Sequence, residues 1–180
     1  MRTRILHFTI AVLLATAAFA QMDKANRPSP PATATCELGG GKKITTDYSS
    51  PRMKGRKIYG DLVPFGPVWR TGANEATTFV TNTNLTVGGK HVPTGAYTIF
   101  TVPNADKWTL IVNKKTGEWG IPYKYEGDEL VRVPMKVSKL ASPAENFSIS
   151  YEKAGEGCTL HIDWETTRAS VEIEPYITTK

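Results

Sequence analysis

Residues that commonly bind metals or activate nucleophiles are scarce in this sequence. It has 3 histidines and 2 cysteines in 180 residues. His91 and His161 fall on the polar faces of expected strands and have no third ligand nearby in the pattern, so no metal and no other cofactor is predicted. No Ser-His-Asp or Cys-His motif and no glycine-rich phosphate loop is present. The sequence therefore identifies no catalytic residue.

Long apolar runs are also absent after the N-terminus. An apolar stretch at residues 10–14 follows Arg2 and Arg4 and precedes the small-residue motif AFA, which ends at Ala20. This layout is typical of a secretory signal peptide, and the stretch is too short for a good transmembrane span. The arginines are not adjacent, which disfavours twin-arginine export, and no cysteine follows the cleavage site to carry a lipid. We expect a secreted or periplasmic protein without a transmembrane segment.

A large excess of one charge is missing as well. The formal net charge is +5, and removal of residues 1–20 leaves +3. The segment Ser50–Thr78 carries five basic and two acidic side chains, which is also a net charge of +3. Attraction for anions is therefore expected to be local to that segment. A nucleic-acid partner would need a broad basic face, and none is predicted.

A period-two alternation of apolar and polar residues dominates the chain after residue 34. It is clearest in four runs, at residues 131–137, 147–152, 158–165 and 168–174. Such alternation is typical of a strand with one buried and one exposed face. Gly88-Gly89 separates two short runs in the way of a two-residue hairpin turn. No stretch shows a convincing helical stripe.

We therefore predict one all-β domain over residues 35–176. The expected architecture is a single-domain, antiparallel, jelly-roll-like β-sandwich with one long ordered loop excursion. If its last two runs close as a hairpin around residues 166–167, His161 faces Glu172 across the pair. Residues 21–34, rich in proline and alanine, are expected to form a flexible tether.

The two cysteines favour one disulfide bridge. Two cysteines in a secreted chain are expected to pair. Cys158 lies on the apolar face of its expected strand, and Cys36 lies in a short expected strand. No histidine or basic residue shares the face of Cys158, which disfavours a reactive thiol. We predict a Cys36–Cys158 bridge that ties the first strand to a late one.

The segment SPRMKGRKIYGDLVPFGPVWRTGANEATT, from Ser50 to Thr78, interrupts the alternation. It contains four glycines and three prolines, yet it keeps many apolar and aromatic residues. We expect a long ordered loop, which is a common place for binding residues. A second aromatic loop, with Trp119, Tyr123 and Tyr125, is expected to close over the same end. Together the two loops would form a cleft with an aromatic wall.

Side chains of the two loops supply the chemistry of a small-ligand site. Arginine matches a carboxylate or phosphate, tryptophan matches a sugar ring, and asparagine both donates and accepts hydrogen bonds. The candidate ligand-binding residues are Arg52, Arg56, Trp69, Arg70, Asn74, Trp119 and Tyr123. A structural interpretation stays open beside this one: Trp69 plugs an open end of the core, and Arg70 pairs with Glu75 to hold the loop.

Three motifs carry a family resemblance. SPRMKGRKIYGDLVPFGPVWRTGANEATTF, VPTGAYTIFTV at Val92–Val102 and NKKTGEWG at Asn113–Gly120 resemble the secreted bacterial family catalogued as domain of unknown function 2911. The resemblance spans residues 34–173 and implies a signal-bearing, single-domain bacterial protein that is exported or belongs to the cell envelope. It implies no activity and no catalytic residue. The cysteine pair is not a feature of the resemblance, so the disulfide rests on the residues alone.

Two classes of function stay open. The first is a non-catalytic envelope module that binds a small anionic or sugar-like molecule, a glycan or another envelope component. The second is a hydrolase that uses Glu75 and Asp61 as acid and base residues in the loop. Glycosidase chemistry would require both carboxyl groups at one site. We favour the binding module.

Overall fold

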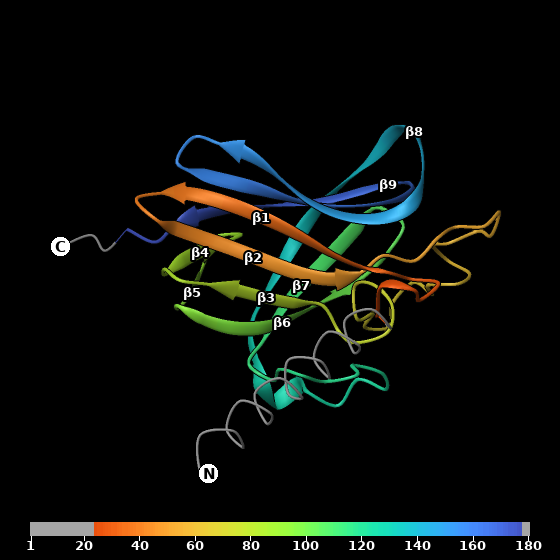
Figure 1. Ribbon diagram of the computed structural model, residues 1–180, viewed down its shortest axis with the longest axis horizontal. Helices are drawn as coiled ribbons and strands as arrows, with labels where there is room; N and C mark the ends of the chain where they lie inside the picture. The colour runs from red at the N-terminus through yellow and green to blue at the C-terminus, as the bar shows by residue number, and fades with distance from the viewer. Residues whose placement is uncertain (1–23, 178–180) are drawn as a thin grey trace, which may run out of the picture.

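The computed structural model describes residues 24–177, so the signal peptide expected in residues 1–20 lies outside the described part of the chain. From residue 31 onward the backbone forms nine strands and one short 3₁₀ helix (Figure 1). Their bounds are β1 Pro31–Gly39, β2 Lys42–Ser49, β3 Thr78–Thr81, β4 Leu85–Val87, β5 Lys90–Val92, β6 Gly95–Val102, β7 Lys107–Asn113, η1 Glu126–Asp128, β8 Glu129–Ala154 and β9 Gly157–Pro175. No helix within residues 24–177 has the length and apolar character needed to cross a membrane.

All nine strands belong to one antiparallel sheet, in the order β1-β2-β3-β6-β7-β8-β9-β4-β5. The all-β fold class is therefore confirmed. The ladder is continuous from strand to strand, so the two separate sheets of a sandwich are not shown. The sheet curls strongly, and its first strand, β1, lies against β8 and β9 (Figure 1). The curled sheet encloses the core between its own two halves.

The two longest strands, β8 and β9, bend together. In β9 the backbone of Glu165 takes a positive φ of 55°, and the register with β8 is broken opposite this point. Each half of β9 pairs with β8 rather than with the other half, so the predicted hairpin around residues 166–167 is wrong. The bend brings His161 to within hydrogen-bond distance of Ser170 in place of Glu172.

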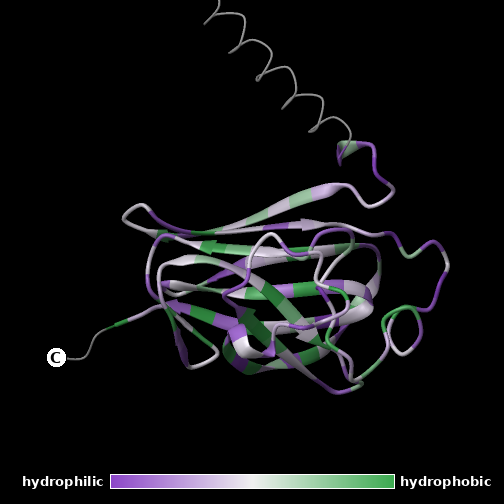
Figure 2. Ribbon diagram, turned by 90° about the horizontal axis from the view of Figure 1, so that it is seen from below, coloured by the Kyte–Doolittle hydropathy of each residue, from purple (hydrophilic) through white to green (hydrophobic). Residues whose placement is uncertain are grey.

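Alternating side chains from the strands form the buried core. Fully or almost fully buried members include Ile44, Phe79, Ile99, Leu110, Leu160 and Ile162. Full burial of such a side chain contributes about 1.5–3 kcal/mol. Figure 2 shows the hydrophobic segments distributed along the strands. The long loop adds Ile58 and Val63 to the same core, so it is packed as a part of the fold.

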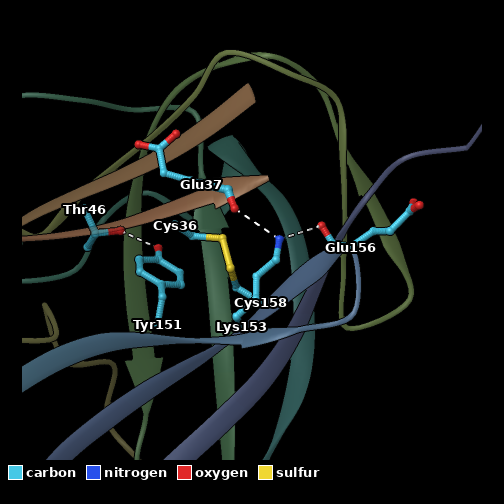
Figure 3. Close-up of a disulfide and its surroundings, with 7 residues drawn as sticks. All are labelled: Cys36, Glu37, Thr46, Tyr151, Lys153, Glu156 and Cys158. Atoms are coloured by element: carbon cyan, nitrogen blue, oxygen red, sulfur yellow. Dashed lines mark hydrogen bonds between the residues drawn. A yellow bond between two sulfur atoms is a disulfide. The ribbon is translucent and has the colours of Figure 1, made fainter. Parts of the chain in front are cut away.

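One disulfide fixes the first strand onto the far side of the sheet. Cys36 of β1 is bonded to Cys158 of β9, with their Cα atoms 6.5 Å apart, and this confirms the predicted pairing. Lys153 donates to two backbone carbonyl groups beside the bridge, one in β1 and one in the turn before β9, at 3.1 and 3.2 Å (Figure 3). The hydroxyl groups of Thr46 and Tyr151 are 2.6 Å apart across the same gap. The two halves of the curled sheet are thus joined covalently and by hydrogen bonds.

The chain before β1 is attached to the domain. β1 begins at Pro31, so residues 31–34 belong to the sheet, and the predicted tether does not extend to residue 34. The carbonyl group of Pro30 accepts a hydrogen bond from the backbone of Ser50 at 2.9 Å. This hydrogen bond holds the residues just before β1 against the start of the long loop that follows β2.

Candidate functional site

Two loops lie at the end of the molecule opposite the end of β9 (Figure 1). They enclose a cleft of about 870 Å³. One loop is the long segment between β2 and β3, and the other connects β7 to η1. The lining is mostly apolar and includes Val63, Pro64, Pro67, Val68, Ile121 and Pro122. Arg56, Trp69, Arg70 and Tyr123, four of the residues predicted for the site, also line it.

Backbone contacts position the long loop beside the sheet. β3 begins opposite Thr98 of β6, and beyond that point Trp69 takes the place of β3, exchanging two hydrogen bonds with Thr101 at 2.7 and 2.9 Å. The second loop touches the first at Gly120, where a Cβ atom would lie 3.1 Å from the Cβ of Arg70. With a φ of 87°, Gly120 also occupies the region that favours glycine. Close approach of the two loops therefore depends on this glycine.

Trp69 lies between the core and the cleft. Its ring is stacked on Trp164, with centroids 6.2 Å apart, and meets the edge of Phe147 at 5.3 Å. Its indole N–H donates to the carbonyl group of Gly72 at 3.2 Å. These contacts give Trp69 the structural role of closing the core, and the same side chain forms part of the cleft wall. The two interpretations of Trp69 are compatible.

Arg70 is a partly buried cation on the cleft wall. Its guanidinium carbon lies 4.9 Å from the ring centroid of Trp119, and its Nη1 donates to the Trp119 carbonyl oxygen at 3.3 Å. Burial lowers the pKa of Arg70, and the more distant Glu75 only partly offsets this effect. None of the ion pairs found within residues 24–177 involves Arg70.

Glu75 has a different partner from the one predicted. Arg27 donates to both of its carboxylate oxygens at 2.9 and 3.0 Å, and Lys24 lies 3.5 Å away. A hydrogen bond with its own backbone, followed by Arg27 and Lys24, lowers the pKa of Glu75 against the opposing effect of burial. The predicted Arg70–Glu75 pair is thus replaced by a pair with a residue 48 positions earlier. Neighbouring Asn74 donates to the carbonyl group of Ser29 at 3.0 Å and does not line the cleft.

The two arginines expected to face a ligand both stabilise their own turn. Arg52 donates to the backbone and hydroxyl oxygens of Ser50, both at 2.8 Å. Arg56 donates to the carbonyl groups of Met53 and Arg52 at 3.0 and 2.6 Å. Arg56 also lines the cleft, whereas Arg52 does not. Within this turn, Arg56 alone combines a structural contact with access to the site.

The second loop is held by a network around Tyr123. Its hydroxyl group donates to Glu129 at 2.7 Å and accepts from Asn113 at 3.3 Å. Burial, and then the hydrogen bond to Glu129, raises the pKa of Tyr123. Arg132 donates twice to the same carboxylate, at 2.8 and 3.1 Å. Trp119 lies at the outer rim of this loop, with 55% of its surface exposed.

The carboxylates proposed for hydrolysis do not meet in the cleft. Neither Asp61 nor Glu75 belongs to its lining, and Glu126 is the only carboxylate among the residues that line it. A glycosidase needs two carboxyl groups about 5–10 Å apart at one site. The described cleft therefore lacks the pair on which that alternative depends.

The bend in β9 assembles a second polar cluster that sequence reasoning missed. Nδ1 of His161 is 2.8 Å from Oγ of Ser170, and Nε2 is 3.1 Å from a carboxylate oxygen of Glu152. His161 and Ser170 border a depression of about 330 Å³ that Lys136 also lines. No group of three metal-binding side chains occurs within residues 24–177. The cluster depends on the bend at Glu165, which local alternation does not reveal.

The fold and the cleft define a single-domain, disulfide-linked β protein whose two loops build a site at one end of a curled sheet. The family follows from a comparison of sequences. Residues 29–173 match the family described as Protein of unknown function (DUF2911), and the chain belongs to it. This confirms the family named from the loop motifs. No curated protein and no solved structure matches the chain.

Proposed function

We propose that this protein is a non-catalytic binding domain whose cleft takes a small ligand with an anionic group and an apolar, aromatic or sugar-like body. The observation that carries the proposal is Arg70. Burial in an apolar cleft removes hydration from this cation, and Glu75 compensates for the loss only in part. A carboxylate or phosphate in the cleft would supply that compensation through charge-assisted hydrogen bonds.

The remaining lining supports a ligand with a substantial apolar surface. A volume of about 870 Å³ lies within the range of small-molecule sites. Val68, Pro67 and Ile121 offer apolar contacts, and the indole of Trp69 offers a flat face. Charged and polar side chains are few in the lining, and they include Arg56, Arg70, Tyr123 and Glu126.

Export to an oxidising compartment is the second part of the proposal. The N-terminal pattern predicts a signal peptide, and the disulfide between Cys36 and Cys158 is of the kind that persists outside the cytosol. We infer a secreted or periplasmic location, where the ligand would be an envelope component or a small molecule from the surroundings.

A ligand screen tests the binding role directly. The exported protein would be screened by thermal shift with benzoate, octanoate, inorganic phosphate and soluble cell-wall sugars, and each hit titrated by calorimetry. Arg70→Gln should weaken a hit by roughly 10- to 100-fold, the value of a lost charge-assisted hydrogen bond. Lys124→Gln, which removes an exposed charge from the second loop, should bind as the unmodified protein does. Equal affinity of Arg70→Gln would contradict the proposal.

A hydrolase remains the second candidate, now at the Glu152–His161–Ser170 cluster. An ionised Glu152 can only accept, so a neutral His161 would carry its proton on Nε2 and present a free Nδ1 to Ser170. Ser170 would attack an ester carbonyl carbon, and its proton would pass through His161 to the leaving alcohol. A fluorophosphonate probe should then label the unmodified protein at Ser170. It should also label the Ser138→Ala variant, but it should not label Ser170→Ala. Absence of labelling would remove this candidate.

A further inference from the structure

Large apolar side chains are exposed around the mouth of the cleft. Leu62 and Phe65 of the long loop are 45% and 43% exposed, and Trp119 and Ile121 of the second loop are 55% and 45% exposed. We call these four residues the apolar rim. Leu62 and Ile121 both line the cleft, so the rim belongs to one end of the molecule. Grouped exposure of this kind marks a surface that contacts something else.

Basic side chains accompany the apolar rim. Lys54, Arg56 and Lys57 lie in the same loop as Leu62 and Phe65, and none of them takes part in an ion pair within residues 24–177. Figure 2 shows hydrophobic and strongly hydrophilic segments together in the loops at this end, opposite the C-terminus. The loop that carries Leu62 and Phe65 therefore also carries three basic side chains, against one exposed acid, Asp61, in the same stretch.

We infer that the apolar rim docks onto an anionic lipid surface. Apolar side chains that enter the interface and basic residues that stay at the headgroup level are the usual combination for peripheral binding. Trp119 suits this boundary because its ring is apolar and its N–H is polar. A protein partner is less well matched, because lysine is depleted in protein interfaces. The rim adjoins the cleft, because Leu62 and Ile121 belong to both, but docking of the rim does not require the guanidinium group of Arg70.

Vesicle flotation tests the inference. The exported protein should float with vesicles of phosphatidylcholine mixed with phosphatidylglycerol, and much less with phosphatidylcholine alone. The double variant Leu62→Ser/Phe65→Ser should weaken binding by roughly tenfold or more. Val80→Ser, which changes a side chain of β3 that is 41% exposed, is the matched control and should bind normally. Circular dichroism melting would verify that each variant is folded.

The charges are tested in the same way. Lys54→Gln/Lys57→Gln should weaken binding by about fivefold for each lysine, or about 25-fold together, and added salt should reduce the difference. Lys42→Gln/Lys90→Gln removes the same charge from the first residues of β2 and β5, outside both cleft loops, and should have little effect. Equal losses in the two double variants would show attraction to the whole protein rather than docking by the rim, and would overturn the inference.

A depth measurement separates docking from ligand uptake. Brominated lipid should quench the fluorescence of Trp119, and Trp119→Phe should lose most of that quenching. Arg70→Gln should still bind vesicles even where it fails to bind a small anion, so failure of the cleft proposal and failure of this one are distinguishable. No flotation with anionic vesicles, or quenching that is unchanged in Trp119→Phe, would overturn the inference.

Discussion

At the scale of single residues, the main finding is the exchange of partners around Glu75. The sequence places Arg70 five positions before Glu75, which suggests a local pair. In the fold, Arg27 is the partner of Glu75. Hydrogen bonds from Asn74 and from the backbone of Ser50 hold residues 29 and 30 against the long loop, and this brings Arg27 close to Glu75. Arg70 is thereby left for Trp119 and the cleft. Proximity in sequence was a poor guide, because the competing partner comes from a segment that looked unstructured.

Double-mutant cycles should reproduce this exchange. We expect a coupling energy of about 0.5–1 kcal/mol between Arg27 and Glu75, because the two side chains are 35% and 44% exposed and solvent screens the pair. Coupling between Arg70 and Glu75 should be close to zero. Urea unfolding of Arg27→Ala, Arg70→Gln, Glu75→Gln and the two double variants measures both values. A larger coupling for Arg70 than for Arg27 would refute the assignment.

At the scale of elements, the second loop is held by the first residue of β8. Burial opposes ionisation of Glu129, but the hydrogen bonds from Arg132 and Tyr123 outweigh it and lower the pKa of Glu129 below its ordinary value of 4.5. A carboxyl group with a lowered pKa stabilises the fold above its ordinary pKa, and the contribution is lost as the pH falls through the lowered value. Acid should therefore loosen the loop that carries Tyr123.

The pH dependence of melting checks this mechanism. The unmodified protein should lose stability between neutral pH and about pH 3, and Glu129→Gln should start lower at neutral pH and lose less on acidification. Glu126→Gln is the matched control, because Glu126 is an exposed acid of the neighbouring η1. Its pH profile should follow that of the unmodified protein. If Glu129→Gln also followed that profile, the network would have no part in acid sensitivity.

The elements themselves could be predicted to different degrees. Alternation identified four strand segments that belong to β8 and β9, because residues such as Val133, Ile149 and Ile162 face the core at every second position, but it did not show that the segments join into two long strands. The bend at Glu165 could not be found in this way, because it depends on how two long paired strands curl together. The cleft was predictable to a similar extent. Composition identified its two loops, but the sequence could not show that Arg52 and Asn74 lie outside the lining, because the fold determines their hydrogen-bond partners.

At the scale of the whole molecule, the Cys36–Cys158 bridge joins an edge strand to the seventh strand of the sheet order. The bridge spans 122 positions, and a loop of that size corresponds to at most about 4–5 kcal/mol of stabilisation. Cys36→Ala/Cys158→Ala should therefore lower the urea midpoint substantially. A reductant should lower the midpoint of the unmodified protein and leave that of the double variant unchanged. A midpoint that does not move on reduction would contradict a stabilising role.

The same bridge determines how the molecule would respond to mechanical load. If the two ends of the chain are pulled apart, only the residues before Cys36 and after Cys158 can extend while the disulfide is intact. The intervening segment would span roughly 400 Å when fully stretched, at about 3.3–3.6 Å per residue, and this length stays hidden from the force. Most of the strands lie within the protected segment, and so do the two loops that form the cleft. The residues after Cys158 are not protected, and they include Trp164, which lines the cleft, so tension would leave both cleft loops in place but would act on this part of the cleft wall.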